Sequence, residues 1–164
     1  MELLNFDDEV LNLAAALRRR GWLLAAAESC TGGLIAAACT AQSGSSDWFE
    51  RGFVTYSNAA KVELLGVPLP LIEAHGAVSA EVVLAMLDGA LRRAPVQLAV
   101  AVTGIAGPSG AVPGKPVGTV WLAWGTPAQR HHELLQLSGD RGQVRSATVR
   151  VALQRLQALT EKSP

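Results

Sequence analysis

A hydroxyl and a thiol stand side by side at Ser29-Cys30, between an apolar run and a run rich in alanine. Residues 23–27 are typical of a short buried strand, and residues 34–39 are typical of a helix. Between them, Gly32 and Gly33 let the backbone turn sharply and let a ligand approach it closely. The first amides of a helix have no intrahelical partner, so we expect them to point at whatever occupies this turn. A nucleophile beside oxyanion or phosphate donors favours acyl transfer or nucleotide binding over a plain structural role.

Two further polar segments follow apolar runs. One covers residues 56–61, and the other begins the Gly- and Pro-rich loop expected at 103–116. Ligands of open α/β sheets bind outside the carboxyl ends of the strands. If the strands before these segments and before Ser29 are parallel, all three segments open on one edge of the sheet. The residues expected to contact a ligand there are Thr31, Gly32, Gly33, Asn58, Thr103 and Gly104.

A serine hydroxyl attacks a substrate only when a neighbouring base takes its proton. The histidines are poorly placed for this, since His75 is expected in a connecting segment and the adjacent His131 and His132 must face opposite sides of a strand. Lysine is the other option, because Ser-Lys pairs are known variants of the catalytic triad. A lysine acts as a base only if burial and nearby positive charge lower its pKa enough to leave a neutral amine. Among the lysines, Lys61 alone follows an apolar strand end.

Two residues near this pair keep more than one interpretation. Tyr56, the single tyrosine of the chain, relays a proton or caps the core with its hydroxyl in water. Cys30 is a rival nucleophile, since a thiolate at a helix N-terminus has a lowered pKa. These considerations leave the choice between Ser29 and Cys30 open.

Arg141 and Arg145 are one helical turn apart on one face, near the start of the last predicted helix. The helix dipole favours anions at that end, so cations there are expected to hold a phosphate or carboxylate of a ligand. Solvated arginines that pair with nearby acids are the alternative. We expect no metal and no other cofactor, because no cluster of His, Cys or carboxylates has the spacing of metal ligands.

The overall charge excludes several functional classes. The 14 basic residues balance the 14 acidic ones, so no overall field attracts nucleic acid or a membrane surface.

Apolar runs are far shorter than the ~20 residues of a membrane-spanning helix. Two cysteines are too few for a disulfide framework and indicate a reducing compartment. Without an N-terminal targeting pattern, we expect a cytoplasmic protein that has no nucleic-acid or membrane partner.

The composition is typical of one compact domain over residues 1–164. Hydrophobic residues make up 49% of the chain and charged residues 17%, which leaves a large apolar face for a partner such as the second copy of a homodimer. The arginine triplet at 18–20 is compatible with nucleic-acid binding. Cations on the last turn of a solvated helix are the favoured interpretation of this triplet.

Helical and strand patterns alternate along the chain. The expected helices lie at 6–20, from 34, from 58, at 82–91 and from 141 to about 159, and the expected strands at 22–27, 52–57, 97–102, 117–124 and 130–137. Pro68 and Pro70 are expected to close the helix that carries Lys61. Asp140 and Gln143 form a variant capping box, and the last two strands are close enough to form a hairpin. The alternation of helices and strands predicts a three-layer α/β/α sandwich with a mixed, mostly parallel central sheet.

Ordered motifs over nearly the whole chain resemble the CinA C-terminal domain family. The matching segments are Ala27-Glu28-Ser29-Cys30-Thr31-Gly32-Gly33, Gly44-Ser45-Ser46, Gly52-Phe53-Val54-Thr55-Tyr56-Ser57-Asn58 with Lys61, His75-Gly76-Ala77-Val78-Ser79, Thr103-Gly104-Ile105-Ala106-Gly107-Pro108, Lys115-Pro116-Val117-Gly118-Thr119-Val120, and Gly139-Asp140-Arg141 with Val144-Arg145. So many motifs in one order make the resemblance specific. The family contains the bacterial nicotinamide mononucleotide (NMN) amidohydrolases, also called NMN deamidases.

The resemblance implies hydrolysis of the carboxamide of NMN to nicotinic acid mononucleotide and ammonia, a salvage step toward NAD that needs no metal. It implies that Ser29 is the nucleophile, Lys61 its base and Tyr56 an assisting hydroxyl. Thr103 and its loop would help to bind the substrate. Larger family members carry an additional N-terminal domain, so this chain is expected to be a stand-alone deamidase domain.

The resemblance also implies that Arg141 or Arg145 lies near the phosphate. The chain departs from the family pattern at 111–113, which is less rich in glycine than expected, and at Gly142, where a larger polar residue is common. The first departure puts the contacts of its loop in doubt, and a glycine at a helix start costs up to ~1 kcal/mol.

Two functions of other classes compete with the enzyme. One is a nucleotide-binding module without turnover that acts in regulation or in a competence or DNA-damage response. The other is an interaction domain that acts through its apolar surface. A serine, a tyrosine and a lysine at the predicted strand ends favour the enzyme, because a module that only binds has no need of a Ser-Lys pair.

Overall fold

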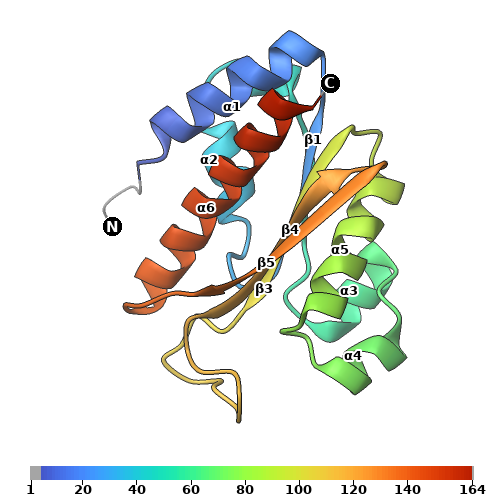
Figure 1. Ribbon diagram of the computed structural model, residues 1–164, viewed down its shortest axis with the longest axis vertical. Helices are drawn as coiled ribbons and strands as arrows, with labels where there is room; N and C mark the ends of the chain where they lie inside the picture. Colours follow the sequence, from blue (N-terminus) through green and yellow to red (C-terminus); the bar gives the residue numbers. More distant parts are fainter. Residues whose placement is uncertain (1–4, 164) are drawn as a thin grey trace.

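A mixed sheet divides the molecule into two layers of helices (Figure 1). The computed structural model describes residues 5–163. The strand order is β2-β1-β3-β4-β5. β1, β2 and β3 run parallel to one another, and β4 and β5 form an antiparallel hairpin beside β3. The strands are β1 (Leu24–Glu28), β2 (Phe49–Val54), β3 (Leu98–Gly104), β4 (Thr119–Thr126) and β5 (Gln129–Gln136).

Helices cover both faces of this sheet (Figure 1). One face carries α1 (Asp7–Arg20), α2 (Leu34–Thr40), α6 (Arg141–Lys162) and the short 3-10 turn η1 (Ser45–Asp47). The other face carries α3 (Asn58–Leu65), α4 (Leu69–His75) and α5 (Ala80–Arg93). Alternate residues of the central strands enter the two cores, as the period of a strand requires: in β1, Leu24 and Ala26 pack toward α1 and α6, whereas Ala25 and Ala27 pack toward α5.

The predicted α/β/α fold with a mixed sheet is confirmed. Four of the five strands run in one direction and β4 in the other, while the pairings divide evenly between parallel and antiparallel. The predicted hairpin is β4-β5, and the predicted capping box joins Asp140 and Gln143 at the start of α6. His131 and His132 face opposite sides of β5, where they lie against Trp124 and Trp121 respectively.

Most strand boundaries are shifted by one to three residues from the prediction, and two of these differences affect the site. β2 ends at Val54, so Tyr56 lies in the loop beyond the strand and not at its tip. The reason is that Val54 pairs with Glu28, the last residue of its single neighbour β1, and no strand is left to pair with beyond it. β3 continues through Thr103 and Gly104, which pair with Trp121 and Val120 of β4. The predicted loop therefore begins after Gly104.

The helix α4 was not predicted. Pro68 and Pro70 were expected to end a helix, but α3 already ends at Leu65. Pro68 is the N-cap of α4 and Pro70 lies in its first turn, where the missing N–H of proline needs no partner. His75 is consequently the last residue of this helix, and the prediction that it lies in a connecting segment is wrong.

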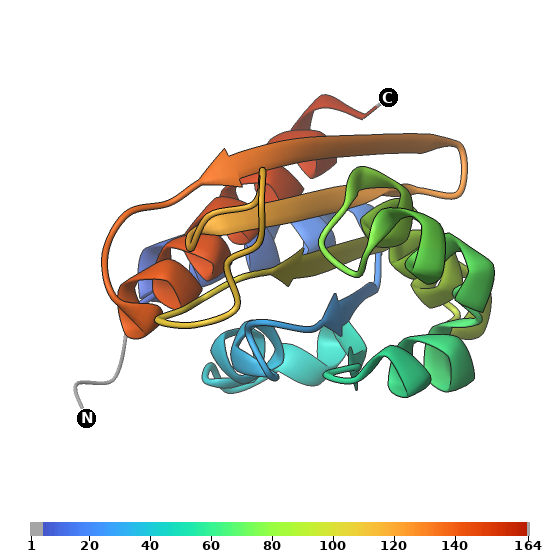
Figure 2. The same cartoon turned by 90° about the horizontal axis from the view of Figure 1, so that it is seen from below.

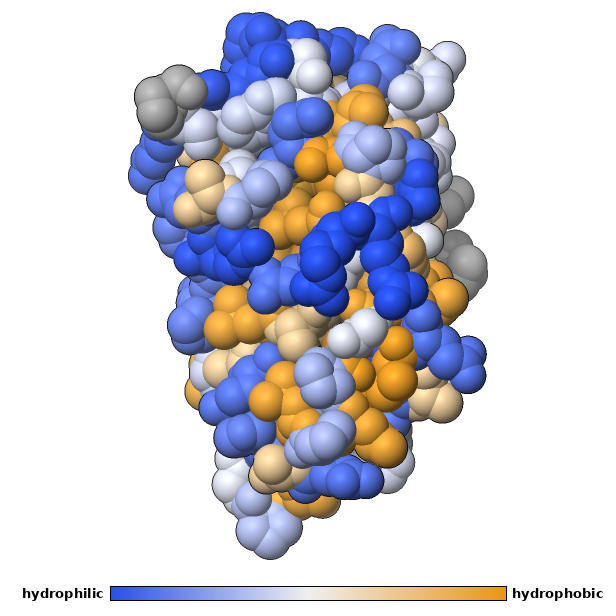
Figure 3. Space-filling model, turned by 90° about the vertical axis from the view of Figure 1, so that its right-hand side faces the viewer, coloured by the Kyte–Doolittle hydropathy of each residue, from blue (hydrophilic) through white to orange (hydrophobic). Residues whose placement is uncertain are grey.

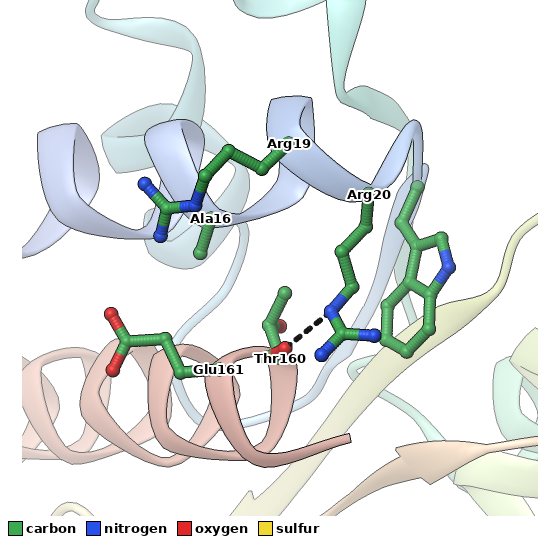
Figure 4. Close-up of a pocket in the computed structure, with 6 residues that line it drawn as sticks. Ala16, Arg19, Arg20, Thr160 and Glu161 are labelled. Carbon is green, nitrogen blue, oxygen red and sulfur yellow. Dashed lines mark hydrogen bonds between the residues drawn. The ribbon is translucent and has the colours of Figure 1, made fainter. Parts of the chain in front are cut away.

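The arginines at the end of α1 tie neighbouring elements together. Arg20 Nε donates to the carbonyl of Thr160 at 2.6 Å, across a hollow between the ends of α1 and α6 (Figure 4). Its guanidinium also lies over the ring of Trp22, 5.0 Å from the centroid. Arg18 donates to the carbonyl of Gly44 and pairs with Asp47. These contacts agree with cations at a helix end whose role is structural.

Apolar side chains gather on the lower half of the face that α3, α4 and α5 share, where polar side chains interrupt them (Figure 3). Leu64 and Leu69 are among the exposed large apolar residues of these helices. That a partner shares an apolar face of the molecule stays a prediction. Across residues 5–163, we find no helix with the length and apolarity needed to span a bilayer.

Candidate active site

The turn of Ser29 connects β1 to α2 at the carboxyl end of the sheet (Figure 2). The amide of Ser29 donates to the carbonyl of Val102 in β3 at 3.1 Å, and the amide of Gly32 donates back to the carbonyl of Ser29 at 3.0 Å. Gly32 and Gly33 both have positive φ angles, 59° and 101°, which favour glycine. The hydroxyl is thus held on a tight turn against the central strand, with 8% of the residue exposed.

Lys61 reaches this hydroxyl from α3. The side chain of Ser57 accepts a hydrogen bond from the amide of Ala60 and so caps α3 directly after the β2 loop. Lys61 is 2% exposed, and its Nζ donates to Ser29 Oγ at 3.1 Å and to the carbonyl of Thr55 at 3.0 Å. Burial lowers the pKa of Lys61 below its ordinary value. This combination provides a buried amine in contact with a serine hydroxyl.

The pKa of the neighbouring Cys30 thiol is shifted in the opposite direction. Burial is the largest influence on Cys30 and raises its pKa to about 11. The thiol therefore stays protonated near neutral pH, and the expectation that the helix N-terminus lowers its pKa is wrong because desolvation is stronger. Lys61 forms its hydrogen bond with Ser29 and not with this thiol.

The first amides of α2 are occupied by the protein itself. Glu28 is 1% exposed, and its carboxylate accepts hydrogen bonds from the Thr31 hydroxyl at 2.6 Å and from the amides of Ile35 and Ala36 at 2.8 and 3.0 Å. The prediction that these amides face a ligand is therefore wrong. No role for Glu28 is predicted from the sequence. The feature that could have indicated its capping role is an acidic residue at the end of an apolar strand, shortly before a helix.

Tyr56 and Arg141 meet at the rim of the site. The Tyr56 hydroxyl accepts a hydrogen bond from Arg141 Nη2 at 2.8 Å, and Arg141 Nη1 donates to the carbonyl of Gly107 at 2.8 Å. Tyr56 is 61% exposed, so it does not cap the core. Arg141 thus bridges the loop after β2 and the loop after β3.

Arg145, one turn further along α6, contacts the turn of Ser29 instead. Its Nε donates to the carbonyl of Cys30 at 3.2 Å and its Nη2 to the carbonyl of Thr31 at 2.9 Å. The two arginines that were predicted as one anion site therefore have different partners.

A cavity of about 240 Å³ lies between these elements. Thr103 borders it, and its hydroxyl donates to the carbonyl of Ala77 at 2.9 Å, which ties β3 to the segment before α5. The cavity is lined by Ser29, Cys30, Tyr56, Asn58, Lys61, Ala77, Val78, Thr103, Gly104, Ala106 and Arg141.

Not all of the predicted contact residues line this cavity. Thr31, Gly32 and Gly33 belong to the turn that follows Ser29, and Arg145 donates to the carbonyls of this turn from α6. Ala77 and Val78, by contrast, were not predicted as part of the site, and their sole signal was the motif that begins at His75. In the part of the chain that the structure describes, no three His, Cys, Asp or Glu side chains are grouped so that they could hold a metal ion.

This chain is similar in sequence to a known family and to several known proteins. The profile of the CinA C-terminal domain family matches residues 8–160. The nicotinamide-nucleotide amidohydrolase PncC of Pseudomonas putida is 54% identical over 147 residues, which cover 90% of this chain and 92% of that protein. The protein of the same name from Escherichia coli K12 is 47% identical over 155 residues, covering 92% and 94%. A longer CinA-like protein of Syntrophobacter fumaroxidans is 48% identical over 160 residues, and this chain spans 38% of its length.

Solved structures agree with these matches. A CinA superfamily protein from Klebsiella pneumoniae superposes with a TM-score of 0.93 at 38% identity, covering 97% of this chain and 99% of the other. A competence/damage inducible protein from Agrobacterium tumefaciens gives a TM-score of 0.93 at 44% identity, with the same coverage. By the extent of both the sequence and the structural matches, the chain belongs to the CinA C-terminal domain family.

Proposed function

We propose that this chain hydrolyses the carboxamide of NMN to nicotinic acid mononucleotide and ammonia, as a step of pyridine nucleotide salvage. The observation that carries the proposal is the 3.1 Å hydrogen bond between Lys61 Nζ and Ser29 Oγ beside a cavity at the carboxyl end of the sheet. The names of the two relatives of similar length describe a nicotinamide-nucleotide amidohydrolase.

Ser29 is the proposed nucleophile, and Lys61 is its base. The lowered pKa of Lys61 raises the fraction of neutral amine near neutral pH. With one N–H bonded to the carbonyl of Thr55, a neutral amine has its lone pair available to Ser29. The lone pair takes the hydroxyl proton as Oγ attacks the carbon of the amide.

The proton on Lys61 then serves the leaving group. The C–N bond of the tetrahedral intermediate breaks as the amide nitrogen takes this proton, so that ammonia departs and an ester remains on Ser29. Water attacks the ester carbon while Lys61 accepts a proton from it. The bond to Oγ breaks, Oγ regains the proton from Lys61, and the carboxylic acid product leaves with the hydroxyl of the water.

The nucleotide would bind with its carboxamide toward Ser29 and its phosphate toward the rim. A cavity of about 240 Å³ lies below the ~300–1,000 Å³ of typical ligand pockets, so it suits the pyridine ring better than a whole nucleotide. Of the two arginines, we favour Arg141 for the phosphate, because it lines the cavity while Arg145 bonds carbonyls of the turn. Tyr56 would assist as a hydroxyl beside Arg141. Asn58, Thr103 and Gly104 would contribute to the walls.

Ammonia release from NMN by the purified chain tests this proposal, with Ser29→Ala as the control and the product identified by mass. Release by the wild type that is lost in Ser29→Ala supports it. A wild type that binds NMN without releasing ammonia would instead make the chain a nucleotide-binding module.

A further inference from the structure

We propose that Glu28 and Arg145 are positioning residues that together fix the turn of Ser29, and that Arg145 therefore acts on the rate of the reaction and not on phosphate binding. The inference rests on the proposed function in that it takes Ser29 as the nucleophile. Neither residue lines the cavity. Glu28 directly precedes Ser29 and bonds the first turn of α2, and Arg145 bonds the segment that follows Ser29.

Glu28 replaces a capping side chain that α2 lacks. The N-cap of this helix is Gly33, which has no side chain to accept a hydrogen bond from the first turn. The carboxylate of Glu28 takes this role from the end of β1, since it accepts from the amides of Ile35 and Ala36 and from the hydroxyl of Thr31. A negative charge is also favoured at this end of a helix. Glu28 thereby fixes α2 to the strand that leads into Ser29.

Arg145 binds the same turn by its carbonyls. It donates to the carbonyls of Cys30 and Thr31, the two residues that follow Ser29. A Cβ on Gly32 would lie 3.6 Å from Arg145 Nη2, so the guanidinium lies directly against the turn. Hydrogen bonds from a charged donor are stronger than those between neutral groups.

Thr31 is bound from both directions, by its hydroxyl to Glu28 and by its carbonyl to Arg145. The two glycines after it give the turn more conformational freedom than any other residue pair would. Fixing Thr31 therefore limits the motion of Ser29 relative to Lys61. A displacement of about 1 Å between reacting groups costs on the order of a hundred-fold in rate.

The first experiment separates positioning from phosphate binding. We would measure kcat and KM of Arg145→Met, Arg145→Lys and Glu28→Gln on NMN and on nicotinamide riboside, which lacks the phosphate, after circular dichroism has verified the fold of each variant. Arg150→Met is the matched control, because Arg150 lies on the same helix and bonds Glu9 and the carbonyl of Asn5.

We expect kcat to fall about ten- to a hundred-fold on both substrates in Arg145→Met and Glu28→Gln. KM and the ratio of kcat/KM between the two substrates should stay within about two-fold, and Arg150→Met should behave as the wild type. Arg145→Lys should recover only part of the loss, since an ammonium does not reproduce the fork of a guanidinium. A higher KM for NMN alone in Arg145→Met, with kcat unchanged, would overturn the role of Arg145.

The second experiment does not need activity. Amide hydrogen exchange by NMR should be faster at Ile35 or at Ala36 in Glu28→Gln, because these amides donate to different oxygens of Glu28 and one of the two oxygens becomes an NH2 donor. If Glu28→Gln does not fold, Thr31→Val removes a single donor to Glu28 and should give a smaller change of the same sign. Unchanged exchange in the variant that folds overturns the role of Glu28. A wild type that releases no ammonia from NMN refutes the proposed function alone, and this exchange test still decides whether the turn is fixed as proposed.

Discussion

Lys61 Nζ and Ser29 Oγ lie 3.1 Å apart although their residues are 32 positions apart in the chain. The parallel strands β1 and β2 bring them together, since Glu28 pairs with Val54 at the last position of both strands. The segments that follow these strands therefore emerge at the same edge of the sheet. One segment provides the hydroxyl, and the other begins the helix that carries the amine.

Ser29→Ala should abolish ammonia release while the fold persists, and Cys30→Ala should keep most of it. The pKa of Cys30 is raised to about 11, so only about one thiol in ten thousand is ionised at pH 7. Steady-state rates of ammonia release for the two variants check this. An inactive Cys30→Ala beside an active Ser29→Ala would assign the nucleophile to the thiol.

Lys61→Arg should be nearly as inactive as Lys61→Met, because a guanidinium does not give up its proton in a protein. In the wild type, kcat/KM should rise with pH through an apparent pKa below the ordinary lysine value of 10.5, since burial lowers the pKa of Lys61. A pH profile of kcat/KM measures this directly. Substantial activity in Lys61→Arg would rule out Lys61 as the general base.

The lowered pKa of Lys61 should also make the free energy of unfolding depend on pH. Lys61 has a lowered pKa in the folded state and the ordinary value of 10.5 in the unfolded chain. Between these two values the unfolded chain binds more protons, so the free energy of unfolding increases with pH and decreases again as pH falls toward the lowered pKa. Relative to Lys61→Met, the wild type should gain up to about 1.4 kcal/mol per pH unit in this window. Urea denaturation at several pH values tests it, and a constant difference would contradict it.

Much of the fold could be predicted because its strongest patterns are local. Residues 98–102 of β3 are all apolar, as expected of a strand buried on both faces, and the capping box of α6 is encoded by Asp140 and Gln143. The edge strand β2 is less regular, because it is half exposed and includes Glu50 and Arg51. Its end depends on where β1 ends, which the local sequence does not record. The start of α4 could not be predicted, because a proline such as Pro70 is common both in the first turn of a helix and just after the end of one.

The candidate site could be predicted where a residue follows an apolar strand. Ser29 and Lys61 have that signal and line one cavity together, while their chemical roles stay predictions. The bonds of Glu28 and Arg145 could not be predicted. They depend on the left-handed turn at Gly32 and Gly33 and on the packing of α6 beside it. Neither the turn geometry nor the neighbouring helix is visible in the spacing of the sequence.

Arg141→Met should reduce the preference for a phosphorylated substrate. A hydrogen bond from a charged group is worth about 1.5–3 kcal/mol, so kcat/KM for NMN should fall roughly ten- to a hundred-fold while that for nicotinamide riboside changes little. Tyr56→Phe is an informative partner variant, since it removes the hydroxyl that accepts from Arg141 and leaves the guanidinium in place. If Arg141→Met leaves the ratio between the two substrates unchanged, this side chain does not bind the phosphate. Lys115, which bonds the carbonyl of His75, would be the next candidate.

Gly118→Ala should destabilise the protein far more than Gly114→Ala. Both glycines have a positive φ, 91° and 80°, so both substitutions carry the strain of about 1–2 kcal/mol that a side chain has in this region. A Cβ on Gly118 would in addition lie 1.9 Å from the carbonyl oxygen of Leu137, whereas none of the surroundings comes within 4 Å of a Cβ on Gly114. Gly118 also donates to the carbonyl of Ile105 and accepts from the amide of Leu137, so relief of the overlap would break the contacts that join the loop before β4 to the segment after β5. We expect a loss of about 3–5 kcal/mol for Gly118→Ala in urea denaturation, and an equal loss in the two variants would contradict the role of this close approach.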